Sequence, residues 1–126
     1  MAWLVRDGPG APPSVLAAAE LATDGRTRRR GLLGRDEFQG ALVLEPCRQV
    51  HTIGMRFPLD VAFCDRTGRV LHVASLKPFR ISRVVWRARF AVEAASGAFE
   101  RWKLAPGDVL RVVLALDEFG EQSAGS

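Results

Sequence analysis

The chain has few of the features that mark secreted or membrane proteins. It contains two cysteines, Cys47 and Cys64, too few for a disulfide framework, and both are expected to be reduced thiols. No apolar run approaches the length that spans a membrane, and the start carries no basic stretch leading into an apolar segment of signal-peptide length. Internal repeats and low-complexity blocks are also lacking. These absences predict a small cytoplasmic protein with no membrane span.

The remaining composition is that of an ordinary globular domain. The chain has 126 residues, of which 48% are apolar and 25% charged, so it can bury one hydrophobic core. Glycines and prolines between residues 8 and 13 are expected to set apart a flexible or loosely attached segment, residues 1–13. We expect a single domain over residues 14–117, followed by a small polar tail, residues 118–126, that frays.

The charge balance is basic, with a formal net charge of +4 at pH 7 and a pI near 10.0. Basic surfaces attract phosphate backbones and acidic lipids, but the distribution of the charge matters more than its sum. Five arginines gather between residues 26 and 35, and no aromatic residue is interleaved with them to offer bases a stacking surface. The cluster is therefore interpreted as the solvated face of a helix, and nucleic acid is not the expected partner.

Short apolar runs separated by turn residues predict a protein built mostly of strands. The Ala-rich stretch 14–23 is interpreted as a strand, and an amphipathic helix is expected over 28–38. Further strands are expected at 41–44, 49–53, 59–63, 70–74, 89–95 and 109–116, with a helical turn at 98–104. This pattern predicts a mostly β (α+β) fold, a compact antiparallel β-sandwich or barrel-like domain with one short N-terminal helix.

The best-specified local element is a hairpin whose turn is formed by residues 65–68. A type I turn with Gly68 in the left-handed conformation sets the register of the two strands. This register gives each strand one apolar face and brings Asp60, Cys64 and His72 together on the other face. The expected pairs are Cys64 with Val70, Phe63 with Leu71, Ala62 with His72, Val61 with Val73 and Asp60 with Ala74.

Two catalytic or metal arrangements follow from the cysteines and histidines. Cys64 as nucleophile, His72 as base and Asp60 as the group that orients the base would resemble a thiol hydrolase. Cys47, His51, Cys64 and His72 would instead offer four zinc ligands. Free cysteines are commonly small buried hydrophobes, and neither spacing is a recognised zinc pair. Structural burial is therefore favoured for both cysteines, and no metal, cofactor or catalytic residue is assigned.

A series of short motifs gives the chain a family resemblance. The motifs are Arg28-x-x-Gly31-Leu32-Leu33-Gly34-Arg35, Pro58-Leu59-Asp60-Val61-Ala62-Phe63-Cys64-Asp65, Gly68-Arg69-Val70, Val92-Glu93-Ala94 with Gly97, and Pro106-Gly107-Asp108-Val109. Their order and spacing resemble the domain of unknown function 192 family over residues 16–113. The resemblance implies a compact β-sandwich or barrel-like domain with a short helix near its start, and it implies no established activity.

One segment departs from the family pattern. Many members carry an aromatic-Trp-Met-Lys-Asn-Thr stretch before the Pro-Leu-Asp motif, whereas this chain has Val50-His51-Thr52-Ile53-Gly54-Met55-Arg56-Phe57. If that stretch lines a pocket in the family, the pocket of this chain has a different polarity. We predict that residues 51–56 and Arg28 form a shallow, polar-rimmed site in which Arg28 and Arg56 hold an anion.

Two acids embedded in apolar strands complete the candidate site. Asp60 and Glu93 each need a partner if they are buried, and Arg28, Arg56 or Arg89 would supply one. The sequence thus predicts a non-catalytic module, a monomer or weak homodimer, that binds a small anionic ligand or an acidic peptide. A small hydrolase or metal-dependent enzyme is the alternative, and a nucleic-acid accessory protein is the second alternative. The candidate binding residues are Arg28, His51, Thr52, Met55, Arg56, Asp60 and Glu93.

Overall fold

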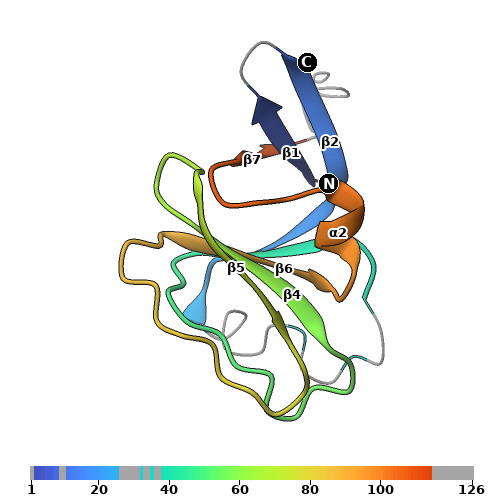
Figure 1. The fold of residues 1–126 in the computed structure, drawn as a ribbon, viewed down its shortest axis with the longest axis vertical. Coiled ribbons are helices and arrows are strands. Elements are labelled where there is room, and N and C mark those ends of the chain that lie inside the picture. Colours follow the sequence, from blue (N-terminus) through green and yellow to red (C-terminus); the bar gives the residue numbers. More distant parts are fainter. Residues whose placement is uncertain (1, 9–10, 26–31, 33–34, 36–37, 115–126) are drawn as a thin grey trace.

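The computed structural model describes residues 2–8, 11–25, 32, 35 and 38–114, and these residues form seven strands and one short helix (Figure 1). The helix α2 spans Ala98–Trp102. The strands are β1 (Ala2–Gly8), β2 (Ala11–Ala22), β3 (Ala41–Leu44), β4 (Leu59–Cys64), β5 (Val70–Leu76), β6 (Phe90–Ala95) and β7 (Val109–Leu114).

All seven strands belong to one sheet in the order β5-β4-β6-β3-β2-β1-β7. In Figure 1, β1, β2 and β7 lie at the top, and β4, β5 and β6 lie below them. The mostly β fold is confirmed, but the sheet is mixed rather than antiparallel because β2 and β3 run parallel. The sheet is not closed into a barrel: its two edge strands meet only near an isolated bridge between Arg69 and Val109.

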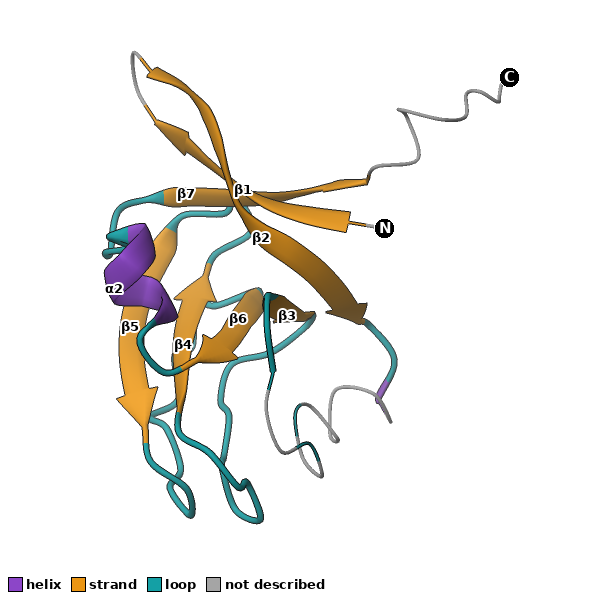
Figure 2. Cartoon of the chain, turned by 90° about the vertical axis from the view of Figure 1, so that its right-hand side faces the viewer, coloured by secondary structure: helices purple, strands orange, loops and turns teal. Residues whose placement is uncertain are grey.

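The two faces of the sheet carry separate hydrophobic clusters. β3 and β4 are buried along their whole length, as expected for central strands covered on both faces. One face packs Leu42, Leu59, Val61 and Phe63 against Met55 and the loops. The other face packs residues of β3, β4 and β6 against Phe99 of α2 and Leu110 of β7. Figure 2 shows the arrangement of α2 and these strands. Within the described residues no helix is long and apolar enough to cross a membrane.

The first residues of the chain are part of the sheet, which differs from the loosely attached segment expected over 1–13. β1 pairs with β2 on one side and with β7 on the other. Leu4 is fully buried, so the apolar start of the chain contributes to the core. The glycine- and proline-rich stretch lies where β1 and β2 meet. The two strands are paired up to this point, where Gly8 pairs with Ala11. Composition predicted a break over residues 8–13, whereas β1 extends to Gly8 and β2 begins at Ala11.

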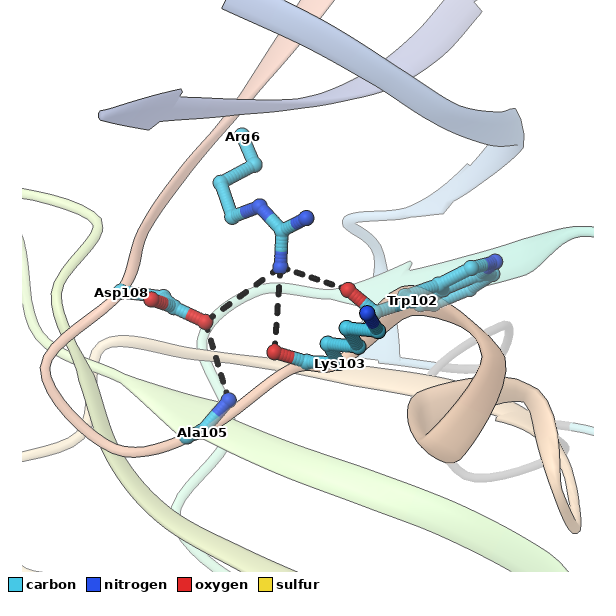
Figure 3. Close-up of polar contacts among 5 residues, drawn as sticks. All are labelled: Arg6, Trp102, Lys103, Ala105 and Asp108. Carbon is cyan, nitrogen blue, oxygen red and sulfur yellow. Dashed lines mark hydrogen bonds and ion pairs between the residues drawn. The ribbon is translucent and has the colours of Figure 1, made fainter. Parts of the chain in front are cut away.

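An arginine on β1 fixes this strand to the helix (Figure 3). The Nη1 of Arg6 donates to the carbonyls of Trp102, at 2.7 Å, and Lys103, at 3.2 Å, where α2 ends. The same nitrogen lies 3.6 Å from Oδ2 of Asp108, which accepts the amide of Ala105 at 2.9 Å. A cation at the end of a helix stabilises its free carbonyls. Arg6 therefore links β1 to the end of α2 and to the turn before β7, which are far from β1 in the sequence.

All but one of the expected strands are confirmed. Residues 49–53 form no strand, since His51 makes only an isolated bridge to Ile81. The helix expected over 28–38 lies mostly outside the described residues, of which Leu32 and Phe38 are buried in the core. The tail expected at 118–126 also lies outside them. The helical turn expected at 98–104 is α2.

The hairpin turn is confirmed, but its register is not. Gly68 has a φ of +89°, and its amide donates to the carbonyl of Asp65 at 2.9 Å. Cys64 pairs with Val70 as expected, and a bulge then shifts the remaining pairs by one residue. The observed pairs are Phe63 with His72, Ala62 with Val73, Val61 with Ala74, Asp60 with Ser75 and Leu59 with Leu76.

The bulge follows a residue that is held from outside the hairpin. The amide of Val70 donates to the carbonyl of Asp108 at 2.8 Å, and its carbonyl accepts the amide of Gly107 at 2.8 Å. These bonds tie the start of β5 to the turn before β7. A register derived from the hairpin sequence alone cannot include them. Because the register is shifted by one residue, His72 lies on the face of Phe63 and not on the face of Asp60 and Cys64.

Candidate functional site

Thr52, a predicted binding residue, is a buried structural link between two loops. Its side chain is fully buried, and Oγ1 donates to the carbonyl of Lys77 at 2.6 Å and accepts the amide of Arg80 at 2.8 Å. Its backbone carbonyl accepts the amides of Met55 and Phe79 at 3.0 and 2.9 Å. The hydroxyl and the carbonyl of Thr52 are thus used inside the protein rather than at its surface.

The neighbours of Thr52 divide between core and surface. Met55 is buried in the hydrophobic cluster, so it is part of the core rather than an adaptable wall of a pocket. His51 is exposed, and its Nδ1 accepts the amide of Ile53 at 3.2 Å. Arg56 is exposed, and Arg28 lies outside the described residues. Of the predicted residues in this loop, His51 and Arg56 present their side chains to solvent.

Asp60 caps the short helix. Its Oδ2 accepts the amides of Gly97 and Phe99 at 3.0 and 3.1 Å, and its Oδ1 accepts the hydroxyl of Ser75 at 2.7 Å. Gly97 has a φ of +97°, a left-handed conformation that glycine adopts without steric strain. The free amides at the start of α2 are thereby satisfied by a residue of β4. Asp60 was expected to pair with an arginine if buried. Its partners are instead two backbone amides and the hydroxyl of Ser75.

Glu93 faces the opposite side of the sheet. It pairs with Val61, the residue next to Asp60, and successive residues of a strand point to opposite faces. Its side chain is buried, and Oε1 has no hydrogen-bond partner in the described part of the chain. Burial raises the pKa of Glu93 to about 7. Arg89, one expected partner, pairs instead with Glu45 at 3.2 Å.

The residues considered from the sequence as a thiol-hydrolase arrangement are not brought together. Cys64 is fully buried on the face of Asp60, and burial raises the pKa of its thiol to about 12, so the thiol is protonated at neutral pH. His72 stacks on Phe63 with ring centroids 6.3 Å apart, on the other face. Burial lowers the pKa of His72, as does the nearby Arg83. The bulge in β5 thus separates the base from the nucleophile.

The four zinc ligands considered from the sequence do not converge either. Among the described residues, no three His, Cys, Asp or Glu side chains lie close enough together to hold a metal ion. The Sγ of Cys47 lies 3.3 Å from the carbonyl of Gln49, to which it donates, while Cys64 is inside the sheet.

The structure shows a different cluster, which sequence reasoning missed. A surface groove of about 520 Å³ lies between two turns, residues 65–68 and 85–88, that are distant in the sequence. The end of β4 and the start of β6 bring them together: the amide of Arg89 donates to the carbonyl of Cys64 at 2.6 Å. We call this groove the arginine groove. Its lining residues are Arg48, Asp65, Arg66, Thr67, Trp86, Arg87, Ala88 and Arg89.

The arginine groove is positively charged because four arginines line it with a single acid, Asp65. Oδ1 of Asp65 accepts the hydroxyl and the amide of Thr67 at 2.6 and 2.9 Å, and the amide of Arg69 at 3.1 Å. The Thr67 hydroxyl is the main cause that holds the pKa of Asp65 below its ordinary value; the backbone amides and Arg87 act in the same direction. The carboxylate therefore stays charged in a groove lined by four arginines.

The arginines of the groove differ in how far they are engaged. Nε of Arg48 donates to the carbonyl of Trp86 at 3.0 Å, and Arg89 pairs with Glu45 across exposed surface. Arg66 and Arg87 are exposed, and the described residues form no hydrogen bond or ion pair with the guanidinium of Arg66. A second groove of about 490 Å³ shares Asp65 and Arg87 with the first and adds Arg69.

Only one local signal could have indicated this site from the sequence. Trp86, Arg87 and Arg89 lie close together in the chain, but Arg48 and Arg66 come from other segments. The compact run of arginines between residues 26 and 35 was the more conspicuous pattern. Sequence proximity therefore drew attention to that run, which lies mostly outside the described residues, and not to the separate segments that form the arginine groove.

The model of the DUF192 family, described as uncharacterized ACR, matches residues 10–112, which is most of the chain. The chain belongs to this family. The match confirms the resemblance seen in the motifs. No curated protein matches the sequence. Membership of the DUF192 family identifies the fold and leaves the activity to be inferred from the site.

Two solved structures share the fold. A protein of unknown function from Novosphingobium aromaticivorans DSM 12444 superposes with a TM-score of 0.75 at 20% identity, covering 86% of this chain and 83% of its own. A protein from Sinorhizobium meliloti 1021, described as a candidate transcription regulator, has a TM-score of 0.73 at 21% identity, covering 89% and 94%. At these identities the likeness shows the DUF192 fold alone.

Proposed function

We propose that this DUF192 protein is a non-catalytic binding module that holds a small anionic ligand or an acidic peptide in the arginine groove. The observation that carries the proposal is the convergence of four arginines from three separate segments on one hollow, facing a single aspartate. Like charges repel, so gathering them lowers stability unless a ligand of opposite charge offsets the repulsion.

The chemistry of the groove suits a polyanion. A guanidinium offers a planar fork of donors that matches a carboxylate or phosphate, and it stays protonated at any physiological pH. Arg66 and Arg87 occupy exposed turns, where they can meet a ligand without losing internal bonds. His51 and Arg56, whose side chains are exposed, remain candidate ligand contacts in this proposal, as does Arg28 from the sequence prediction.

A thiol hydrolase is the weaker candidate. It would need a reactive thiolate, and the high pKa of Cys64 and its complete burial disfavour one. A reducing compartment such as the cytoplasm is part of our proposal, supported by two free thiols, Cys47 and Cys64. The proposal also takes the protein as a monomer or weak homodimer.

Titration calorimetry with inorganic tripolyphosphate at low ionic strength tests the proposal. We expect binding that weakens by at least about tenfold in the double variant Arg66→Ala/Arg87→Ala, since each guanidinium supplies a charge-assisted pair of roughly 1 kcal/mol or more. The matched control is Arg80→Ala/Arg101→Ala, which removes the same charge from residues outside both grooves. A glutamate hexapeptide, titrated in parallel, shows whether carboxylates serve as well as phosphates.

Equal losses in the two double variants would mean that tripolyphosphate responds only to net charge, and the proposal would fail. Absence of binding to both probes by the unmodified protein would also overturn it. Retained binding in the control pair and loss in the groove pair supports it.

A further inference from the structure

Trp86 stands at the rim of the arginine groove with 78% of its surface exposed. Its position is fixed by the turn that carries it. The amide of Ala88 donates to the carbonyl of Val85 at 3.0 Å, and the amide of Val85 donates to the carbonyl of Arg48 at 2.8 Å. Val85 and Ala88 are buried, so the two residues between them, Trp86 and Arg87, form an exposed tip on an anchored base.

The backbone of Trp86 is held as well. Nε of Arg48 donates to the Trp86 carbonyl at 3.0 Å, across 38 residues of sequence. Because the backbone that carries it is already held, the indole loses only side-chain freedom when a flat ligand stacks on it. Aromatic rings beside a positively charged groove are the combination that binds the bases of nucleotides, because bases stack while arginines hold phosphates.

The positive charge continues beyond the first groove. The second groove shares Asp65 and Arg87 with it and contains Arg69, so five arginines and one aspartate line the two hollows together. Five arginines are more than a single carboxylate can pair with. It suits a ligand that places one flat ring at Trp86 and more than one phosphate along the arginines.

We infer that the arginine groove takes a nucleotide unit, with the base stacked on Trp86 and the phosphate held by Arg66 and Arg87. The inference rests on the proposed function and names its ligand class. The nucleotide unit comes either as a free nucleoside polyphosphate or within a single-stranded nucleic acid. The arginine run between residues 26 and 35 lacked a stacking surface, whereas this groove has one.

Matched pairs of ligands with and without bases test the inference. The first pair is ATP and inorganic tripolyphosphate; the second is a 12-nucleotide oligothymidylate and an abasic strand of the same length. We expect a preference of about tenfold for the base-bearing member of at least one pair, because stacking on one aromatic side chain supplies this much. Preference in the first pair identifies a free nucleotide, and preference in the second alone identifies a strand.

Variants of Trp86 assign the preference to the indole. Trp86→Ala should remove it, whereas Trp86→Phe, which keeps an aromatic face, should retain most of it. Trp102→Phe, on α2, is the control for changes at another tryptophan. Stacking is overturned if both members of each pair bind equally or if Trp86→Ala keeps the preference.

The two proposals fail in different ways. If tripolyphosphate binds, the Arg66→Ala/Arg87→Ala variant weakens it, and bases add nothing, the groove is an anion site and only the nucleotide inference is lost. If no probe binds, both are lost.

If the ligand is a single-stranded nucleic acid, its affinity should also depend on salt. The slope of log affinity against log salt concentration should become shallower by about 0.7 for each phosphate contact that an arginine variant removes.

Discussion

Two polar regions of this DUF192 protein use their side chains in opposite ways. The first region comprises the loop 50–57 and Asp60. Its buried polar atoms form hydrogen bonds within the protein. In the second, the arginine groove, the guanidinium groups of Arg66 and Arg87 extend from turns whose backbone bonds hold the shape without them. Polar residues near a family motif can therefore be structural, while the binding that we propose depends on surface charges from separate segments.

The comparison predicts that changes in the first region lower stability and leave anion binding intact. Asp60→Ala should have the largest effect. It leaves the amides of Gly97 and Phe99 without their acceptor, and an unsatisfied buried donor costs about 1–3 kcal/mol. We expect a loss of about 3 kcal/mol in the free energy of unfolding, measured with urea.

The control for Asp60 is Asp7→Ala, which removes an exposed pair with Arg111 at 2.7 Å. Exposed ion pairs contribute about 1 kcal/mol or less, so its loss should be small. Equal stability losses for the two variants would show that Asp60 does not hold the helix.

Glu93 gives the next effect, through pH. Burial raises its pKa from 4.5 to about 7, so between these values the folded protein binds a proton that the unfolded chain has released. The free energy of unfolding contributed by this group therefore falls as pH rises through that window. Glu93→Gln should abolish this fall. Between pH 4.5 and pH 8, the free energy of unfolding of the variant should therefore increase by about 3 kcal/mol relative to that of the unmodified protein.

Urea unfolding of both proteins at the two pH values measures the Glu93 effect directly. Contributions from other groups, such as the lowered pKa of Asp65, are common to the two proteins and cancel in the difference. Parallel pH profiles would contradict a raised pKa for Glu93.

Thr52 gives the smallest of the three effects. Thr52→Val preserves the shape of the side chain but removes a hydroxyl that donates to Lys77 and accepts from Arg80. We expect a loss of about 2 kcal/mol, since the carbonyl and amide left behind are only partly shielded from water. Serine at the same position keeps the hydroxyl and should lose less; a serine variant as unstable as the valine variant would assign the effect to packing instead.

Features of the fold that are set by neighbouring residues could be predicted from the sequence. Features that depend on contacts between distant segments could not. Central strands such as β3 and β4 were predictable because a continuous apolar run is a local signal. The Gly68 turn was predictable for the same reason, and its φ of +89° agrees. The bulge after Val70 was not, because its backbone is held by the turn before β7, more than thirty residues further on.

The candidate site followed the same division. The need of Asp60 for a partner was evident from an acid in an apolar strand, but the partner is a helix start that only the fold brings near. The parallel contact of β2 with β3 and the pairing of β1 also depend on the whole sheet. The arginine groove joins segments around residues 48, 66 and 87, so no single window of the sequence contains it.

The most direct test measures tripolyphosphate affinity and the free energy of unfolding together in two variants, Thr52→Val and Arg66→Ala/Arg87→Ala. The account predicts a crossed result: the threonine variant loses about 2 kcal/mol of stability and binds normally, and the arginine variant keeps its stability within about 0.5 kcal/mol and binds at least about tenfold more weakly. An arginine variant that binds as well as the unmodified protein, or a threonine variant that loses binding while still folded, would contradict the division between the two regions.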